Sequence, residues 1–153
     1  MSERKTGSAL RFGSDLIVEL LREMGIEYVA FNPGGTIRGL HDSLVNANPG
    51  RPPLPILCCH EEVAVALAHG YAKAAGKPMA VLLDNGIGLL HGSMAIYNAW
   101  SDRAPIMILG GTGPLDIVKR RPKFDWVHSA WVQGNVVRDF VKADGQPASV
   151  ASI

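Results

Sequence analysis

The sequence predicts an α/β protein built on an open parallel sheet with helices on both faces. Short apolar runs alternate with longer segments of helical periodicity along the chain. The apolar runs are continuous and do not alternate with polar residues, which is typical of parallel strands buried on both faces. With 153 residues, 47% of them hydrophobic, the chain is long enough for one domain with a substantial core.

The first elements follow from periodicity and from turn residues. Residues 8–24 place Leu and Ile side chains on one helical face, and Gly25 is a suitable stop. Residues 26–31 form a short apolar run and are expected to be a strand, which the Asn-Pro-Gly-Gly turn at 32–35 ends. Thr36 can cap a helix that runs to about residue 45.

The middle of the chain repeats this pattern twice. After a loop rich in Asn, Pro and Gly, residues 54–59 predict a second strand and residues 61–75 a helix closed by Gly-Lys-Pro. Residues 79–83 predict a third strand. A turn at 84–88 then leads into a helix that runs to about residue 100.

The last third of the chain gives weaker signals. Residues 105–109 predict a fourth strand, and residues 110–124 a long loop. Residues 126–133 are expected to be partly helical, and residues 136–141 to be a weak strand or the start of a helix. Residues 146–153 are small and polar, a composition that normally leads into a further element. We therefore expect residues 1–153 to be a single domain that lacks its last helix and strand.

Charge and composition exclude several classes of function. Lys plus Arg number 15 and Asp plus Glu 14, and no basic stripe predicts nucleic-acid binding. No apolar run is long enough to cross a bilayer, and the first residues do not form a signal peptide. The adjacent Cys58 and Cys59 are best explained by packing in a reducing compartment. These features predict a cytoplasmic protein that binds a small molecule or another protein.

Candidate site residues follow three predicted strands, where ligands bind in open parallel sheets. The first strand ends in the turn at 32–35, the second in His60-Glu61, and the third in the turn at 84–88. The glycines in these turns do not form a nucleotide-binding signature, and no serine-protease-like triad is recognisable. A metal site at His60 and Glu61 is not favoured, because no His lies four residues after His60. On spacing alone, Glu61 is as well explained as a helix-start carboxylate favoured by the helix dipole.

Several motifs in order along the chain widen this interpretation. They are Phe-Asn-Pro-Gly-Gly at 31–35, His-Glu-Glu at 60–62, the Ala-rich helix at 66–72, Gly-Lys-Pro at 76–78, Gly-Ile-Gly at 86–88, the segment 98–105 and the segment 137–142. Together they resemble the pyrimidine-binding domain of thiamine diphosphate-dependent enzymes, in the decarboxylase and acetolactate synthase group. The resemblance covers nearly the whole chain and implies a flavodoxin-like fold.

The resemblance implies a role for Glu61. In the family, the glutamate after the His contacts N1′ of the aminopyrimidine ring of the cofactor. A proton shared with N1′ favours the imino form of the ring, which activates the thiazolium carbon. An apolar cleft disfavours the charged form of a carboxyl group, which would help Glu61 share that proton. Glu62 is then expected to point to the surface or to a subunit contact.

The resemblance implies further site residues in the loops after the first and third strands. Pro33, Gly34 and Gly35 match the first active-site loop of the family, although some decarboxylases have an acidic residue where Gly35 stands. Asn85 and Gly86 belong to the loop after the third strand. In the same loop, Asp84 is either a substrate-facing acid or a turn-capping residue.

Two positions nearer the end of the chain resemble functional residues of the family. His128 lies where some decarboxylases have a catalytic His. Gln133 is near a glutamine used in the synthase group.

The resemblance also defines what this chain does not supply. The family binds the diphosphate and Mg²⁺ in a different domain, through a Gly-Asp-Gly signature closed by Asn-Asn, and Gly-Asp-Gly does not occur here. We therefore expect a homo- or hetero-oligomer in which a diphosphate-binding domain or subunit completes the site. The substrate would be a small 2-keto acid, and this chain alone would be inactive. The alternatives are a non-catalytic dimerisation or regulatory module that kept the fold, and a stand-alone nucleotide-binding protein.

Overall fold

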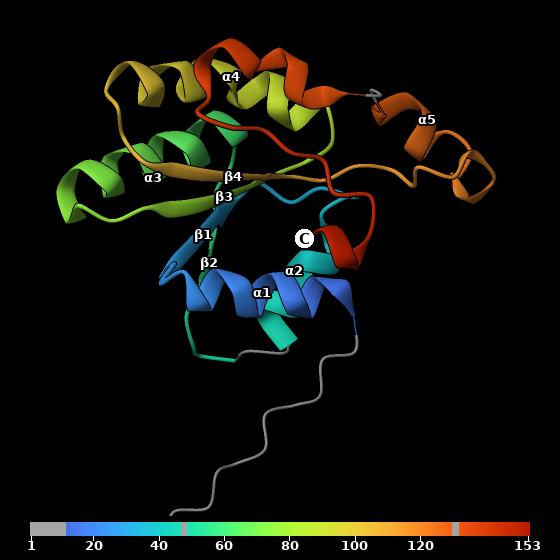
Figure 1. Ribbon diagram of the computed structural model, residues 1–153, viewed down its shortest axis with the longest axis horizontal. Helices are drawn as coiled ribbons and strands as arrows, with labels where there is room; N and C mark the ends of the chain where they lie inside the picture. Colours follow the sequence, from blue (N-terminus) through green and yellow to red (C-terminus); the bar gives the residue numbers. More distant parts are fainter. Residues whose placement is uncertain (1–11, 47–48, 130–131) are drawn as a thin grey trace, which may run out of the picture.

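A four-stranded parallel sheet forms the centre of the molecule (Figure 1). The computed structural model describes residues 12–46, 49–129 and 132–153. The strands lie in the order β2-β1-β3-β4, and every pairing is parallel. Their bounds are β1 Tyr28–Phe31, β2 Leu54–Leu57, β3 Met79–Leu83 and β4 Ile106–Gly110. The prediction of an open parallel α/β sheet is confirmed.

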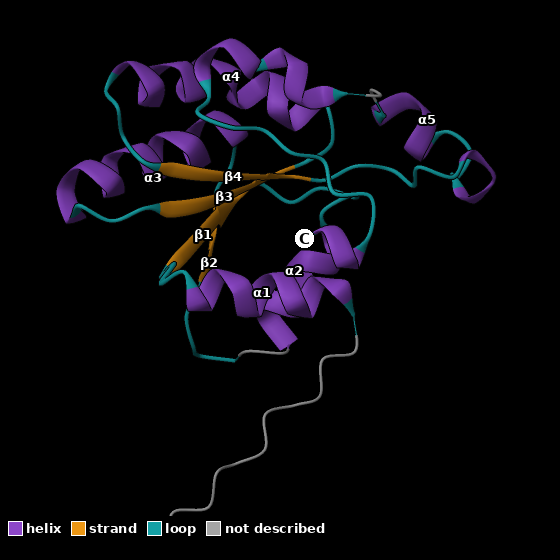
Figure 2. Ribbon diagram, in the orientation of Figure 1, coloured by secondary structure: helices purple, strands orange, loops and turns teal. Residues whose placement is uncertain are grey.

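Helices cover both faces of the sheet, as predicted (Figure 2). One face carries α1 (Gly13–Glu23) and α2 (Arg38–Asn46), and the other carries α3 (Glu61–Ala75) and α4 (Ile87–Ser101). The shorter helices are α5 (Phe124–His128) and the 3₁₀ helices η1 (Ile117–Lys119), η2 (Gln133–Val136), η3 (Arg138–Phe140) and η4 (Val150–Ser152). In the described part of the chain, no helix is both long enough and apolar enough to span a membrane.

The core consists of two apolar clusters, one on each face of the sheet. All five residues of β3 are buried, because this strand has a neighbour on each side and helices above and below. Met79, Val81 and Leu83 belong to the cluster under α3 and α4, whereas Ala80 and Leu82 belong to the cluster with α1 and α2. This alternation follows from the two-residue period of a strand.

Small residues allow α3 and α4 to pack closely against each other and against the sheet. Ala64, Ala68 and Ala95 are buried between them. A Cβ atom on Gly92 would lie 3.3 Å from side-chain atoms of both Leu83 and Val65, so this position has little room for a larger residue. The start of α4 is thereby held against the start of α3, where the candidate site residues lie.

The structure corrects several predicted boundaries. Residues 136–141 are not a strand, because the amides of Val137 and Phe140 bond to carbonyls three residues earlier and form local 3₁₀ turns. The apolar pattern there reflects packing of Val137 against the α3–α4 cluster. The second strand ends at Leu57, two residues earlier than predicted, and the helix predicted from Trp126 spans Phe124–His128. The predicted helix start at residue 8 lies outside the described residues, and α1 begins at Gly13.

Candidate functional site

The loops that follow β1, β2 and β3 meet at the carboxyl ends of these strands, as the sequence predicts. The strand order places β1 between β2 and β3, so their loops are neighbours. Asn32 of the first loop donates a hydrogen bond to Glu61, which follows the second strand. Thr36 of the first loop bonds to Asp84, which follows the third. The three predicted site segments therefore form one contiguous group.

Glu61 is the first residue of α3 and is buried, with 6% of its surface exposed. Its Oε1 accepts a hydrogen bond of 3.1 Å from the Asn32 side-chain amide. Its Oε2 lies 3.5 Å from Nδ1 of His91, in the second turn of α4. The neighbouring Glu62 is exposed, as expected. Glu61 is thus turned towards the neighbouring loops, which a simple helix-start carboxylate would not require.

His60 caps α3 and positions the start of this helix. Its Nδ1 accepts a hydrogen bond of 3.1 Å from the backbone amide of Glu62. Its ring stacks on the ring of His91, with centroids 5.0 Å apart and an interplanar angle of 14°. The two imidazoles therefore form a layer beside the carboxylate of Glu61.

By distance alone, His60, Glu61 and His91 could be considered as metal ligands, since one donor atom from each lies within 4.8 Å of the others. Two features argue against this interpretation. The two rings are stacked and nearly parallel, so their in-plane nitrogen lone pairs lie in separate planes and do not converge well on one ion. Moreover, an Nδ1 that accepts the Glu62 amide leaves the proton of the neutral ring on Nε2, which then cannot bind a metal. The cluster is better described as a hydrogen-bonding group.

Asp84 clamps the loop after β3 to the loop after β1. Its Oδ1 accepts hydrogen bonds from the backbone amide of Thr36, at 3.1 Å, and from the Thr36 hydroxyl. The hydroxyl oxygen in turn accepts a hydrogen bond of 3.0 Å from the backbone amide of Asn85. This network supports the interpretation of Asp84 as a loop-fixing residue over that of a substrate-facing acid.

Three glycines allow these loops to pack closely against their neighbours. A Cβ atom on Gly34 would lie 2.6 Å from Cβ and Oδ2 of Asp84 and closer still to its Cγ. A Cβ atom on Gly88 would lie 3.5 Å from Cγ of Glu61. Gly86 has a φ of +51°, which favours glycine, and its Cβ position is 3.0 Å from the carbonyl oxygen of His128. Backbone therefore approaches closely on both sides of Glu61 and Asp84.

Asn85 is fully buried and carries an acceptor without a partner. Its Nδ2 donates a hydrogen bond of 3.2 Å to the Ser129 hydroxyl. In the described part of the chain, its Oδ1 is the buried side-chain atom for which no hydrogen-bond partner is found. Because an unpaired buried oxygen is unfavourable, this atom is available to a donor from a ligand.

The other two sequence candidates contact the loop after β3 in different ways. His128, at the end of α5, directs its Nδ1 to the carbonyl oxygen of Phe124, at 2.8 Å, and its backbone carbonyl lies beside Gly86. Gln133 bridges two loops, because its Oε1 accepts from the Gly86 amide and its Nε2 donates to the Gly111 carbonyl oxygen, both at 2.8 Å. Gln133 therefore fixes the β3 and β4 loops relative to each other.

An ion pair anchors α5, which lies beyond the carboxyl ends of the strands (Figure 1). The carboxylate of Asp125 is almost fully buried and accepts hydrogen bonds from the backbone amide and the guanidinium of Arg121. These hydrogen bonds hold the pKa of Asp125 below its ordinary value. The pair therefore ties the first turn of α5 to the segment that precedes it.

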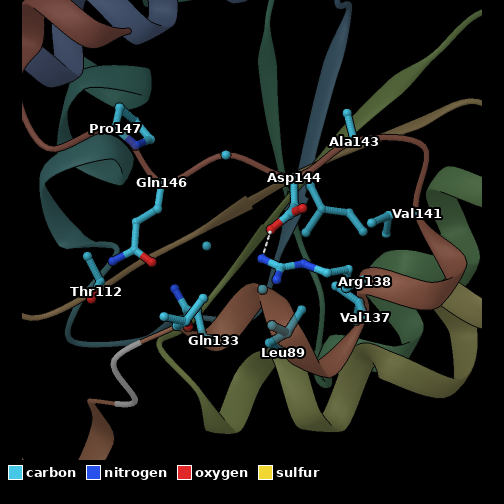
Figure 3. A pocket seen from close by; sticks show the side chains of 15 residues that line it. Leu89, Thr112, Gln133, Val137, Arg138, Val141, Ala143, Asp144, Gln146 and Pro147 are labelled. Atoms are coloured by element: carbon cyan, nitrogen blue, oxygen red, sulfur yellow. Dashed lines mark hydrogen bonds and ion pairs between the residues drawn. The ribbon is translucent and has the colours of Figure 1, made fainter.

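A cavity of about 520 Å³ lies away from Glu61, between the outer side of β4, the start of α4 and the segment 132–147 (Figure 3). Arg138 and Asp144 face each other across its wall in an ion pair of 2.8 Å. The hydrogen bond from Arg138 lowers the pKa of Asp144. Gln133 also lines this cavity, so its loop bridge separates the cavity from the strand-end group.

Sequence reasoning did not identify His91 and understated Asn32 and Thr36. Asn32 was part of a turn motif, and Thr36 was expected only to cap a helix. A signal for His91 does exist, since it lies three residues after Gly88 and so shares its helical face. That face is the one that approaches Glu61.

Comparison with known proteins gives matches over most of the chain. The family model described as "Thiamine pyrophosphate enzyme, N-terminal TPP binding domain" matches residues 11–137. The acetolactate synthase large subunit of Lactococcus lactis is 35% identical over 108 residues, which is 70% of this chain and 18% of that protein. The corresponding subunit of Haemophilus influenzae is 34% identical over 99 residues, 65% of this chain and 17% of that protein.

Solved structures show the same fold. Benzoylformate decarboxylase from Polynucleobacter necessarius superposes with a TM-score of 0.75 at 24% identity, over 91% of this chain and 24% of that chain. A putative thiamin diphosphate-dependent enzyme from Mycobacterium smegmatis gives a TM-score of 0.61 at 26% identity, over 74% of this chain and 22% of that chain. In these comparisons the present chain spans about a sixth to a quarter of the length of the relative.

Proposed function

The chain belongs to the family of N-terminal TPP binding domains of thiamine pyrophosphate enzymes, and we propose that it forms the pyrimidine-binding part of such an enzyme acting on a 2-keto acid. The reaction would be a decarboxylation or a carboligation, and its relatives include an acetolactate synthase and a benzoylformate decarboxylase. The observation that carries this proposal is the buried carboxylate of Glu61 at the carboxyl ends of the strands.

The donor and acceptor groups present fit an aminopyrimidine ring. Glu61 has one oxygen fixed by Asn32. Among the described residues no hydrogen bond to its Oε2 is found, so this oxygen can share a proton with the ring nitrogen N1′. The unpaired Oδ1 of Asn85 can accept a hydrogen bond from an amino group. When bound, the cofactor supplies the carbanion chemistry, and the protein positions and tunes it.

The other predicted site residues act through the loops. Pro33, Gly34 and Gly35 would form one wall of the site, and Gly86 would belong to the other. The glycines allow these loops close contact with neighbouring protein atoms. Asp84 and Gln133 hold these loops in place. His128 would need its ring to turn away from the Phe124 carbonyl before it could reach a substrate.

We further propose that another domain or subunit binds the diphosphate and Mg²⁺, so that this chain alone is inactive. Gly-Asp-Gly does not occur among its 153 residues. A surface for such a partner adjoins Glu61, because large apolar side chains are exposed along α3 and α4. They are Val63, Leu67, Ile87, Leu90, Met94, Tyr97 and Trp100. An apolar surface of this kind is typical of a protein–protein interface.

The decisive test is Glu61→Gln in the assembled enzyme, with Glu62→Gln as the matched control. Each change removes one carboxylate, and the two positions are adjacent in the chain. Of the two, only Glu61 is buried and directed at the strand-end loops. Turnover of a 2-keto acid should fall at least about 100-fold in Glu61→Gln, as is usual when a positioned acid–base group is removed. Glu62→Gln should retain turnover, and an equal rate in both variants would refute the proposed role.

The exposed apolar face of α3 and α4 also favours a second function, a non-catalytic dimerisation or regulatory module. Co-purification of the tagged chain from its source cell separates the two possibilities. A co-purified polypeptide carrying Gly-Asp-Gly would support the enzyme. Self-association without such a polypeptide would support the module, and Glu61 would then be a structural residue.

A further inference from the structure

β4 is an edge strand, and its outer side has no neighbouring strand among the described residues. In a parallel ladder, alternate residues of a strand direct their amide and carbonyl to the same neighbour. The amide of Gly111, directly after β4, bonds to the Leu83 carbonyl oxygen, so every second residue back from 111 faces β3. Ile106, Ile108 and Gly110 therefore direct their amides and carbonyls outwards.

The opposite edge of the sheet, at β2, is of a different kind. The amides of Leu54 and Cys58 bond to carbonyl oxygens of the β1 side, so Pro55 and Leu57 are the residues of β2 that face outwards. A proline has no amide to offer, and an outward proline is a common way of protecting a sheet edge from further pairing. The five residues of β4 include no proline. The β4 edge can therefore accept another strand, whereas the β2 edge is protected.

The cavity of about 520 Å³ lies along the open edge of β4 (Figure 3). Four of its lining residues are apolar and belong to, or pack against, the cluster under α3 and α4: Leu89, Ile108, Val137 and Val141. The segment 143–147 contributes a more polar wall. Because the side chains of a strand point alternately to the two faces of its sheet, a strand in this cavity would direct every second side chain at the apolar wall.

Other occupants of the cavity fit less well. A small ionic ligand is not favoured, because the charged residues in the wall, Arg138 and Asp144, already pair with each other at 2.8 Å. A second copy of the chain could offer two edges, but its β2 carries Pro55 and its β4 lies beside its own segment 132–147. The relatives contain much additional polypeptide, since this chain corresponds to 17% of one and 24% of another. A segment of such polypeptide has neither obstacle.

We propose that the β4 edge and this cavity form a groove for one extended strand, supplied by the polypeptide that completes the enzyme and lies outside these 153 residues. The strand bonds through its backbone to Ile106, Ile108 and Gly110 and carries apolar side chains at alternate positions. Gln133 lines the groove and holds the Gly86 amide, so the seated strand also packs against a residue that fixes the loop after β3. The source of the strand rests on the proposed function, whereas the open edge does not.

The first test compares amide hydrogen exchange in the 153-residue chain and in the assembled enzyme. In the chain alone, the outward amide of Ile108 should exchange at least about 100-fold faster than that of Leu109, which faces β3. In the assembled enzyme, the two amides should be similarly protected. An Ile108 amide that exchanges equally fast in both samples would overturn the proposal. Protection that appears in the chain alone and rises with its concentration would identify a second copy as the occupant and would also overturn it.

The second test identifies the occupant by cross-linking in the assembled enzyme. Photoleucine, a diazirine analogue of leucine, replaces Val132, which lines the groove and is 47% exposed. The matched control replaces Val45, which is 44% exposed and lies on α2, on the other face of the sheet. After irradiation, mass spectrometry should find position 132, and not position 45, linked to an apolar segment outside residues 1–153. A link from position 132 to a second copy of the chain, or to no polypeptide, would overturn the proposal.

These measurements separate the groove from the proposed function. If the Ile108 amide is protected in the assembled enzyme but Glu61→Gln retains full turnover, the proposed function fails and the groove stands. If turnover is lost in Glu61→Gln but the Ile108 amide remains unprotected, only the inference about the groove fails.

Discussion

The contact between Gly34 and Asp84 allows a quantitative prediction for the variant Gly34→Ala. The added Cβ would lie 2.6 Å from Cβ and Oδ2 of Asp84, well below the 3.0 Å that real Cβ atoms keep. The Asp84 side chain cannot move freely, because the amide and the hydroxyl of Thr36 both bond to its Oδ1. Either the loops separate, or Asp84 turns away and loses these bonds.

Both routes predict a similar loss of stability. Overpacking of a filled site lowers the free energy of unfolding by about 1–3 kcal/mol. A lost hydrogen bond to a charged group lowers it by about 1.5–3 kcal/mol. Gly34→Ala should therefore destabilise the chain by about 2–3 kcal/mol. In urea this lowers the unfolding midpoint by about 1 M, with no change in the slope of the transition.

A double-variant cycle, followed by tryptophan fluorescence in urea, identifies the cause. Asp84→Gly removes the three atoms nearest to the new methyl group, so Gly34→Ala in that background should cost less than about 1 kcal/mol. Gly39→Ala, in α2 with no atom within 4 Å of the added Cβ, is the control and should not destabilise the chain. If Gly34→Ala costs the same with and without the Asp84 side chain, the steric argument is wrong.

Three further predictions can be checked on the same chain. The cap of α3, Gly76, and Gly70 in the interior of the same helix both have free space at Cβ, but only Gly76 has a left-handed φ, of +66°. Calorimetry should therefore show that Gly76→Ala lowers the stability by about 1 kcal/mol. Gly70→Ala should raise it by about 0.5–1 kcal/mol. Asp125→Asn should melt at a lower temperature than the wild type at pH 7. Arg121 lowers the folded-state pKa of Asp125, so the ionised carboxylate stabilises the fold at a pH above the pKa of the unfolded state. The difference in melting temperature between the wild type and Asp125→Asn should therefore narrow as the pH falls below about 4. A difference that stays constant would contradict the assignment. Met94→Glu, on the exposed face of α4, should weaken assembly about tenfold in sedimentation without changing the melting temperature.

The elements predicted best are those whose ends are defined by local chemistry. The predicted bounds of α3 and β3 agree with the structure at both ends. His60 caps the start of α3, Gly76 ends it in the left-handed conformation, and the Pro78 and Asp84 positions delimit β3. Residues 136–141 have no such caps, and their apolar pattern fits several conformations. Their backbone is decided by packing against α3 and α4, which the local sequence does not encode.

The same distinction applies to the candidate site. Glu61 could be located because the carboxyl ends of parallel strands meet at one edge of a sheet, which is a property of the fold class. The contact of His91 with Glu61 depends on how α4 is rotated about its own axis relative to α3. Gly88 and Gly92 set this rotation by allowing close approach, and it becomes evident only when both helices are placed.

The alternation of β3 residues between the two apolar clusters has a consequence for cooperativity. Val81 and Leu83 complete the cluster under α3 and α4, and Ala80 and Leu82 complete the cluster with α1 and α2. Because consecutive residues of one strand serve both clusters, β3 cannot leave one of them without leaving the other. Amide exchange in α1 and in α3 should therefore be limited by the same global opening, with no intermediate in which one layer remains folded.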